Sequence, residues 1–284
     1  MPLPTLPADL DDLVALAIAE DVGGGDVTAD LLPADSRAEA SVVTRERAVL
    51  CGTAWFDRVF AQLDPAVSPD WRAADGDLVE AGTELCRLTG PARPLLSGER
   101  TALNFLQTLS GTATLARRYA DAVAGTGCRV LDTRKTLPGL RSAQKYAVAC
   151  GGGSNHRHGL FDAVLVKENH IMAAGGIRAA LRAARALHPE LTIEIEVESL
   201  AELEQALAGG PDVILLDNFD LESMRRAVAR TRGGPGAARL EASGNVSLAT
   251  VRDIAETGVD FVSVGELTKN VRAVDLSMRF RLAT

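Results

Sequence analysis

The stretch TIEIEVESLAELEQALAGGPDVILLDNF, residues 192–219, decides the fold. It opens with a strand-length run, passes into an amphipathic stretch over Leu200–Leu207 and ends in a second apolar run, Val213–Asp217. Apolar strands separated by helices are typical of a parallel sheet that is covered on both faces. The stretch therefore predicts one strand–helix–strand unit of an α/β domain.

The same unit recurs from about residue 128 onward. Six apolar runs have strand length: Arg129–Thr133, Ala163–Lys167, Thr192–Val197, Val213–Asp217, Arg239–Ala242 and Phe261–Val264. Amphipathic stretches lie between most of them: Ile177–Leu187, Leu200–Leu207, Leu221–Arg230 and Leu248–Glu256. No GxGxxG motif opens the first unit, so the repeats favour an α/β barrel over an open dinucleotide-binding sheet.

Residues 1 to about 112 have a different, mixed pattern. Helical spacing predicts a helix over Asp9–Glu20 and another over Ser97–Leu109, with Ser97 as the cap of the second. Short strands are expected at Ala40–Thr44, Ala48–Cys51 and Leu85–Leu88. This part of the chain predicts a separate α/β domain.

Composition narrows the class of protein. The net charge of -8 over 284 residues argues against a broad nucleic-acid surface. Apolar runs are too short to cross a membrane, and the start, MPLPTLPADLDD, lacks the features of a signal peptide. The four cysteines form no CxxC pair, which indicates buried, reduced thiols in a cytoplasmic protein.

Polar residues and glycines gather where the predicted strands end. The strand ends run into Asp132-Thr133-Arg134-Lys135, Lys167-Glu168-Asn169-His170, Glu194/Glu196/Glu198, Asp217-Asn218, Ser243-Gly244-Asn245 and Gly265-Glu266. The C-terminal ends of barrel strands converge on one face, and that face carries the active site. The sequence therefore predicts a polar site built from six strands.

Charges at this face are sorted by sign. The span from Arg129 to His170 holds seven Lys or Arg and three acids, a local balance of +4, and three of the four histidines. A basic pocket in an acidic protein suits a small polyanion. A solvated helix face with salt bridges is the alternative, and it explains Arg141 and Lys145 better than the strand-end residues Arg134, Lys135 and Lys167.

Acids and glycines occupy the other strands. Carboxylates such as Glu196 and Asp217 can bind Mg²⁺ or accept hydrogen bonds from ribose hydroxyls; alternatively, lysines such as Lys135 or Lys167 pair with the strand glutamates. The late loops Ser243–Asn245 and Val264–Glu266 can bind a phosphate through backbone N–H groups, or they are tight turns.

Taken together, these stretches resemble the quinolinate phosphoribosyltransferase family from Glu20 to Arg279. The matching stretches include EDVGGGDVT (20–28), LLSGERTALNFLQTLSGTAT (95–114), DTRKTLPGLR (132–141), GGGSNHRHGLFDAVLVKENH (151–170) and LEASGNV (240–246). The resemblance implies transfer of phosphoribose from phosphoribosyl pyrophosphate to quinolinate with decarboxylation, which gives nicotinate mononucleotide, carbon dioxide and pyrophosphate.

The resemblance also implies an architecture. An N-terminal α/β sandwich, residues 1–112, is joined by the C-terminal tail, about 270–284, and packs beside an incomplete α/β (TIM-like) barrel, residues 113–269. Two chains form a homodimer with shared active sites, and Mg²⁺ is the cofactor.

By the same resemblance, individual positions acquire roles. Arg100 reaches the partner's site, and its place at the start of a predicted helix is mildly unfavourable for a cation, which suggests another reason for its presence. The cationic and polar lining for quinolinate and phosphates is Thr133, Arg134, Lys135, His156, Arg157 and Lys167. Glu196 and Asp217 serve the ribose and metal, and the catalytic set is Lys135, Lys167, Glu196 and Asp217. The 5′-phosphate loops are Ser243, Gly244, Asn245, Val264, Gly265 and Glu266; a small residue is usual at the position of Glu266, so its side chain receives no role.

Three other functions stay open from the residues themselves. The first is a phosphoribosyltransferase for another pyridine carboxylate such as nicotinate. The second is a Schiff-base aldolase-type barrel with Lys167 as nucleophile, which requires a desolvated, neutral lysine. The third is a non-catalytic binding protein, which the presence of both the basic and the acidic residues disfavours.

Overall fold

The computed structural model describes residues 3–233 and 238–283, which form two compact units. Unit 1 comprises the residues up to Arg117, Thr136–Gly152 and the residues from Leu267 on; unit 2 comprises Arg118–Lys135 and Gly153–Glu266. The predicted domain boundaries after residues 112 and 269 stay a prediction, and residues 1, 2, 234–237 and 284 of those domains lie outside the described residues.

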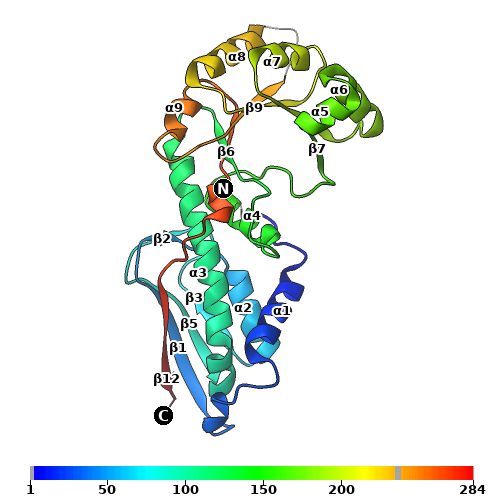
Figure 1. Cartoon of the computed structure of the whole chain (residues 1–284). Coiled ribbons are helices and arrows are strands. Elements are labelled where there is room, and N and C mark those ends of the chain that lie inside the picture. Colours follow the sequence, from blue (N-terminus) through cyan, green and yellow to red (C-terminus); the bar gives the residue numbers. More distant parts are fainter. Residues whose placement is uncertain (1–2, 234–237, 284) are drawn as a thin grey trace. The chain divides into compact units, whose positions relative to one another are not determined.

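Unit 1 contains an antiparallel sheet in the order β12–β1–β5–β3 (Figure 1). Its strands are β1 (Arg37–Thr44), β3 (Ser68–Trp71), β5 (Glu84–Pro91) and β12 (Leu276–Leu282), and β2 (Ala48–Val49) pairs separately with β4 (Leu78–Val79). The strands expected near 40–44, 48–51 and 85–88 are present. Periodicity did not predict β3, whose sequence SPDW has proline and aspartate in place of the usual strand residues.

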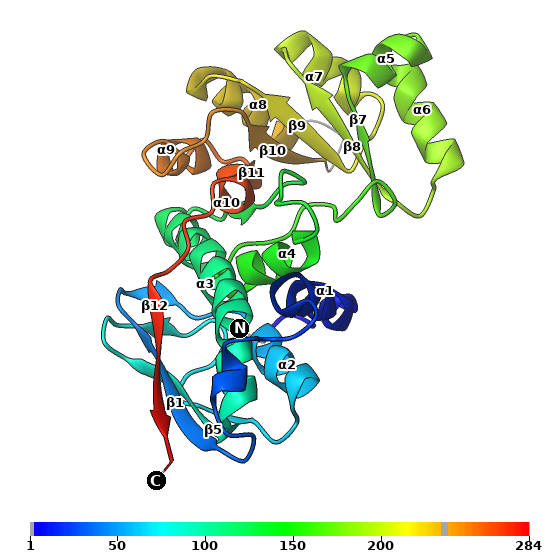
Figure 2. The same ribbon diagram turned by 60° about the horizontal axis from the view of Figure 1, so that its bottom comes forward.

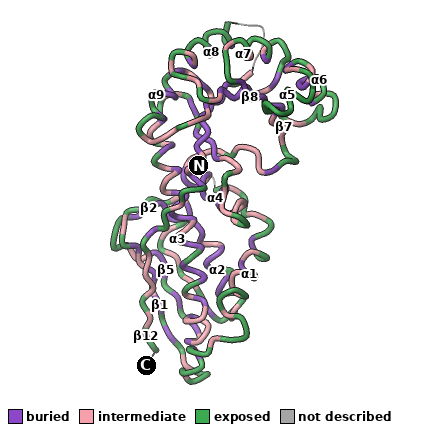
Figure 3. The backbone as a smooth tube through the Cα atoms, viewed as in Figure 1, coloured by how far each residue is buried: buried purple, intermediate pink, exposed green. Residues whose placement is uncertain are grey.

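One face of this sheet packs against helices. Alternate residues of β1, such as Val42, join Leu88 of β5 and the apolar faces of α2 (Thr53–Leu63) and α3 (Ala92–Ala122) in one core, seen as the purple stretches of these elements in Figure 3. Helices α1 (Leu10–Val22) and α4 (Arg141–Cys150) add Val14 and Tyr146 to it, and a short 3-10 helix spans Ala29–Leu31. The predicted α/β sandwich is confirmed.

The start predicted for the second helix was wrong. Helix α3 begins at Ala92, not near Ser97, because Pro94 falls in its first turn, where the missing N–H has no intrahelical partner in any case. Ser97 is no cap: its hydroxyl donates to Asp26 Oδ2 at 2.8 Å. Arg100 follows Ala92 by eight residues, so the argument from an unfavourable helix start does not hold.

Unit 2 is built on a parallel sheet in the order β6–β11–β10–β9–β8–β7 (Figure 2). The strands are β6 (Arg129–Leu131), β7 (Ala163–Val166), β8 (Thr192–Val197), β9 (Val213–Asp217), β10 (Arg239–Ser243) and β11 (Phe261–Ser263). Each lies within two residues of its predicted run. Among the described residues β6 and β7 form the two ends of the sheet, as expected of an incomplete barrel.

Helices surround the outer side of this sheet (Figure 2). They are α5 (Glu168–Ala174), α6 (Ile177–Leu187), α7 (Leu200–Leu207), α8 (Leu221–Gly233) and α9 (Val251–Ala255), and α10 (Glu266–Lys269) follows β11. Buried residues such as Leu181, Leu203 and Met224 face inward from three of them. In the described ranges, 3–233 and 238–283, no helix has the length and apolar character that a membrane crossing requires.

Candidate active site

A cavity of about 350 Å³ opens where the strands of unit 2 end. Its lining comes from β7, β8, β9, β10 and β11, from the residues that follow β6 and β7, and from the segment before β7: Thr133, Arg134, Lys135, His156, Arg157, Leu165, Lys167, Glu196, Leu215, Asp217, Glu241, Ser243 and Ser263. The structure therefore brings together most of the residues predicted for the site. The C-terminal strand ends converge as expected for a barrel.

The basic side of the cavity is built on the residues that follow β6. The Thr133 hydroxyl accepts a hydrogen bond from the Lys135 backbone N–H at 3.1 Å, which shapes this turn. Asp132 is fully buried, and its Oδ1 accepts from the backbone N–H of His156 at 2.9 Å. A buried carboxylate thus fixes the irregular segment that delivers His156 and Arg157 to the cavity.

Arg157 lies close to other cations. Its Nη1 donates to the carbonyl of Ala163 at 3.3 Å. Burial, and then the charge of Arg134, lower the pKa of Arg157, while Glu194 and Asp162 oppose this change. Guanidinium groups held near one another against their mutual repulsion favour an anion between them.

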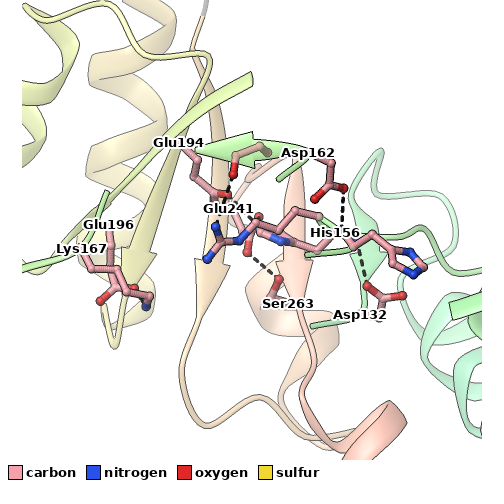
Figure 4. A network of polar contacts seen from close by, with 11 residues as sticks. Asp132, His156, Asp162, Lys167, Glu194, Glu196, Glu241 and Ser263 are labelled. Carbon is pink, nitrogen blue, oxygen red and sulfur yellow. Dashed lines mark hydrogen bonds and ion pairs between the residues drawn. The ribbon is translucent and has the colours of Figure 1, made fainter. Parts of the chain in front are cut away.

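The acidic side begins with an ion pair. Lys167, directly after β7, binds the carboxylate of Glu196 on β8, and Figure 4 shows these two side chains together. Asp217 ends β9; burial first and the charge of Glu196 second raise the pKa of Asp217, while Lys167, Asn218 and Lys135 lower it. Three of the four predicted catalytic residues, Lys167, Glu196 and Asp217, therefore interact electrostatically, and the fourth, Lys135, also acts on Asp217.

Glu241 and Ser263 were missing from the predicted site, and Glu194 was named among the strand-end acids without a role. Glu194 and Glu241 are buried, at 4% and 1% exposure, and both approach His156: its Nε2 lies 2.8 Å from Glu194 Oε2 and 3.5 Å from Glu241 Oε2. The Ser263 hydroxyl donates to Glu241 (Figure 4). Alternation along RLEAS places Glu241 on the same strand face as Ser243, a signal that the sequence did contain.

The loop after β10 is shaped for a close backbone approach. Gly244 has φ +101°, and a Cβ there would lie 2.2 Å from Asn218 Oδ1. Asn218 and Asn245 have φ values of 55° and 50°, in the left-handed region. Ser243 lines the cavity, while Gly244 and Asn245 continue the loop beyond it. Such a turn presents backbone N–H groups to an anion.

The loop after β11 adjoins the basic side. A Cβ on Gly265 would lie 3.3 Å from Cδ of Lys135, so the glycine leaves room for that lysine. Val264 is buried. Glu266 accepts a hydrogen bond from the hydroxyl of Tyr119, and burial, followed by this bond, raises the pKa of Tyr119. The Glu266 carboxylate thus has a structural partner, which accounts for a charged side chain in a predicted phosphate loop.

Arg100 is exposed, belongs to unit 1, and is not among the residues that line the cavity. Among the residues that the structure describes, two sets of potential metal ligands differ from the predicted pair Glu196 and Asp217. They are His156 with Glu194 and Glu241, and Cys51 with Asp75 and Cys150, each with its ligand atoms within 4.8 Å of one another. In the second set Asp75 already accepts from Gly52, Thr53 and Tyr146, which explains it as a buried structural acceptor.

Comparisons with known proteins agree with this geometry. Residues 26–110 match the N-terminal domain and residues 112–279 the C-terminal domain of quinolinate phosphoribosyl transferase. The chain is 43% identical over 274 residues to nicotinate-nucleotide pyrophosphorylase (carboxylating) of Mycobacterium leprae, covering 94% of this chain and 95% of that protein. It is 43% identical over 263 residues to a probable enzyme of the same name from Synechocystis, covering 92% and 89%.

The chain is also similar to solved structures over its whole fold. The nicotinate-nucleotide pyrophosphorylase of Francisella tularensis superposes with a TM-score of 0.92 at 43% identity, covering 99% of both chains. NadC from Streptococcus pyogenes gives a TM-score of 0.94 at 38% identity over 100% of both. The chain belongs to the quinolinate phosphoribosyltransferase family.

Proposed function

We propose that this protein transfers phosphoribose from phosphoribosyl pyrophosphate to quinolinate and releases carbon dioxide, pyrophosphate and nicotinate mononucleotide, a step of NAD biosynthesis. One observation carries the proposal. A single cavity at the strand ends is lined by cations that follow β6 and β7 or lie in the His156 segment, and by carboxylates of β8 and β9. Family membership supplies the reaction that fits this separation of charge.

The basic side suits the dianionic acceptor. Quinolinate carries two adjacent carboxylates, and Arg134 and Arg157 can each bind one through paired N–H groups, with His156 in the same lining. Lys135 lies beside Gly265, so it is placed to bind phosphate oxygens together with the late loops. Ser243, Gly244 and Asn245 would hold the 5′-phosphate.

The acidic side suits the ribose and a metal ion. Glu196 and Asp217 lie on neighbouring strands and line one cavity, and the charge of Glu196 contributes to the raised pKa of Asp217. Two carboxylates that repel each other across a shared space are a suitable donor set for a divalent cation. They would hold Mg²⁺, whose charge would offset that of the leaving pyrophosphate.

The chain's own groups then act mainly by position and charge. As the pyridine nitrogen bonds to ribose C1 and the C1–pyrophosphate bond breaks, positive charge develops on the ribose ring, close to the carboxylates of Glu196 and Asp217. Lys135 and Lys167 would bind the pyrophosphate oxygens. The carboxylate next to the ring nitrogen then leaves as carbon dioxide; its electron pair stays on the ring carbon, stabilised by the positive nitrogen, and a proton from water replaces it. No side chain is required as base in that step.

We further propose a homodimer in which Arg100 reaches the partner's cavity. Arg100 is exposed on α3 and far in sequence from the lining residues of unit 2, yet it lies in the family stretch GERTALN. A guanidinium there would add a cation to the polyanion site of the other chain.

The alternatives differ in what they require. An aldolase-type nucleophile needs a desolvated, neutral lysine, whereas the Lys167 side chain is 48% exposed and paired with Glu196. A nicotinate-specific enzyme has one carboxylate to bind and does not need the cluster of Arg134, His156 and Arg157.

Turnover of quinolinate and nicotinate, measured side by side with phosphoribosyl pyrophosphate and Mg²⁺, tests the proposal: we expect quinolinate to react and nicotinate to be a poor substrate. Preference for nicotinate would refute it.

A further inference from the structure

The hydroxyl of Tyr119 contacts both of the loops that are proposed to bind the 5′-phosphate. Strands β10 and β11 are adjacent and parallel, so the loops that follow them, Ser243–Asn245 and Val264–Glu266, are neighbours. Tyr119, near the end of α3, donates its hydroxyl proton to the carboxylate of Glu266. The backbone N–H of Leu248, just beyond the first loop, also hydrogen-bonds to this hydroxyl. One phenol therefore joins the two loops.

The surroundings of Tyr119 make it a permanent donor. The side chain is fully buried, so without a partner its hydroxyl would lose the hydrogen bonds that water offers the unfolded chain. Burial first, and the bond to Glu266 second, raise the pKa of Tyr119 against the opposing effects of Arg118 and Leu248. The phenol thus retains its proton, and the carboxylate of Glu266 is the group that accepts it.

The charge of Glu266 is unfavourable in a loop that receives a phosphate. The preceding residue, Gly265, leaves room for the side chain of Lys135, which lines the cavity. A carboxylate one residue further would repel a phosphate at this place and compete with it for the lysine ammonium. Glu266 is half-buried and is not among the residues that line the cavity. Its bond to Tyr119 therefore directs the charge elsewhere.

We propose that Tyr119 is a positioning residue for the 5′-phosphate of phosphoribosyl pyrophosphate: its hydroxyl holds the Glu266 carboxylate out of the cavity and joins the loops after β10 and β11. The inference deepens the proposed function and rests on it, because phosphoribosyl pyrophosphate is the substrate concerned. Tyr119 touches no reacting atom. It acts through Glu266 and through the backbone of the two loops.

The consequence is a coupling between two side chains. Without the Tyr119 hydroxyl, the Glu266 side chain turns towards the phosphate, and repulsion weakens the binding of that end of the substrate. If the charge of Glu266 is removed as well, no repulsion remains, so the loss of the hydroxyl matters little. A hydroxyl that only stabilised the fold would have the same effect with or without the charge.

Isothermal titration with ribose 5-phosphate measures this end of the site without turnover. The proteins compared are wild type, Tyr119→Phe, Glu266→Gln and the double variant. Glutamine has the length of glutamate and an acceptor oxygen but no charge. Tyr119→Phe should bind ribose 5-phosphate about tenfold more weakly than wild type, which corresponds to about 1.4 kcal/mol. Glu266→Gln should bind at least as tightly as wild type, and the double variant should regain most of the loss.

The other tyrosine of the chain, Tyr146 on α4, provides the matched control. It is also buried, and its hydroxyl donates to a carboxylate, Asp75 Oδ2, at 2.9 Å, but both residues belong to unit 1. Tyr146→Phe should lower the temperature of thermal unfolding, as Tyr119→Phe does, and should leave the affinity for ribose 5-phosphate unchanged.

Glu266→Asp tests the same bond without altering Tyr119. Its carboxylate retains the charge but is one methylene too short to accept from the phenol, so it should bind ribose 5-phosphate as weakly as Tyr119→Phe. Unchanged affinity in Tyr119→Phe or, if that variant does not fold, in Glu266→Asp would overturn the inference. An equal effect of Tyr119→Phe in the wild-type and Glu266→Gln backgrounds, or a wild type that does not bind ribose 5-phosphate, would also overturn it.

Steady-state kinetics separates this inference from the proposed function. In an active enzyme, Tyr119→Phe should raise the KM for phosphoribosyl pyrophosphate about tenfold and change kcat and the KM for quinolinate by less than about twofold, because the phosphate does not react. If wild type does not turn over quinolinate, the proposed function fails, and the titrations with ribose 5-phosphate still decide the role of Tyr119.

Discussion

The ammonium group of Lys167 binds the carboxylate of Glu196, and this pair joins the basic and acidic sides of the cavity. Lys167 follows β7, and Glu196 lies on the adjacent strand β8. The lysine side chain is 48% exposed and that of Glu196 16%, so the pair is worth about 1 kcal/mol or less after solvent screening. Substrate anions can therefore take Lys167 from Glu196 at small cost, which frees the carboxylate for the ribose or the metal.

Arg134 should carry much of the affinity for quinolinate. Replacing it in Arg134→Ala removes a charge-assisted contact worth about 1.5–3 kcal/mol, roughly a ten- to hundred-fold loss of affinity. Isothermal titration with quinolinate measures this loss, and Arg178→Ala, an exposed arginine on α6, is the matched control. An unchanged affinity in Arg134→Ala would remove Arg134 from the site.

Turnover should depend on Mg²⁺, and the affinity for Mg²⁺ should weaken in acid. Excess EDTA is expected to abolish activity, and the double variant Glu196→Gln, Asp217→Asn should require much more Mg²⁺. Because the pKa of Asp217 is raised, its carboxylate is protonated at a higher pH than an ordinary aspartate, so Mg²⁺ affinity should fall early as pH decreases. Full activity in EDTA would count against the metal; a normal Mg²⁺ requirement in the double variant would refute only these ligands.

Replacing Gly244 should weaken the binding of phosphoribosyl pyrophosphate, whereas replacing a control glycine should not. An alanine there has both a strained φ of +101° and a Cβ 2.2 Å from Asn218 Oδ1, so the loop must shift. Gly125→Ala is the control, because its φ is +81° and nothing lies within 4 Å of the added Cβ. Both variants should lose about 1–2 kcal/mol of unfolding free energy. Only Gly244→Ala should raise the KM for phosphoribosyl pyrophosphate; an equal KM in both variants would contradict the assignment.

Arg100 should act across a dimer interface. Inactive Arg100→Ala chains mixed with inactive Lys167→Ala chains can form a mixed dimer with one site that carries neither substitution. After subunit exchange, activity should rise toward about a quarter of wild type, since half of the dimers are mixed and half of their sites are intact. If mass spectrometry confirms exchange and no activity returns, Arg100 does not complete a partner's site.

Periodicity predicted most barrel elements well because the helices have one clear apolar face and the strands are continuous apolar runs. Helices Ile177–Leu187 and Leu200–Leu207 and strands Thr192–Val197 and Val213–Asp217 have the predicted bounds. It predicted less of unit 1: the resemblance placed the C-terminal tail with this domain, but no strand was predicted for β12, although LSMRFRL alternates apolar and polar residues. The predicted helix was shorter than α3 because the local sequence at Ser97 resembles the cap of a helix start.

The site was predictable only where residues follow strands. Lys167 and Asp217 could be placed because strand ends of a barrel converge. His156 and Arg157 lie in an irregular segment without periodicity; they counted toward the basic span Arg129–His170, but their roles came from the resemblance. Glu241 was missed since a single acid inside an apolar strand gives no indication of its partners. Its contact with His156 joins residues 85 positions apart, which only the tertiary fold brings together.

The release of carbon dioxide tests the central claim most directly. Purified protein is supplied with phosphoribosyl pyrophosphate, Mg²⁺ and quinolinate labelled with ¹⁴C in the carboxylate next to the ring nitrogen, and labelled carbon dioxide, pyrophosphate and nicotinate mononucleotide are measured. We predict equal amounts of all three products and no labelled carbon dioxide without phosphoribosyl pyrophosphate. Absence of labelled carbon dioxide, with quinolinate left unchanged under these conditions, would contradict quinolinate phosphoribosyl transfer as the function of this cavity.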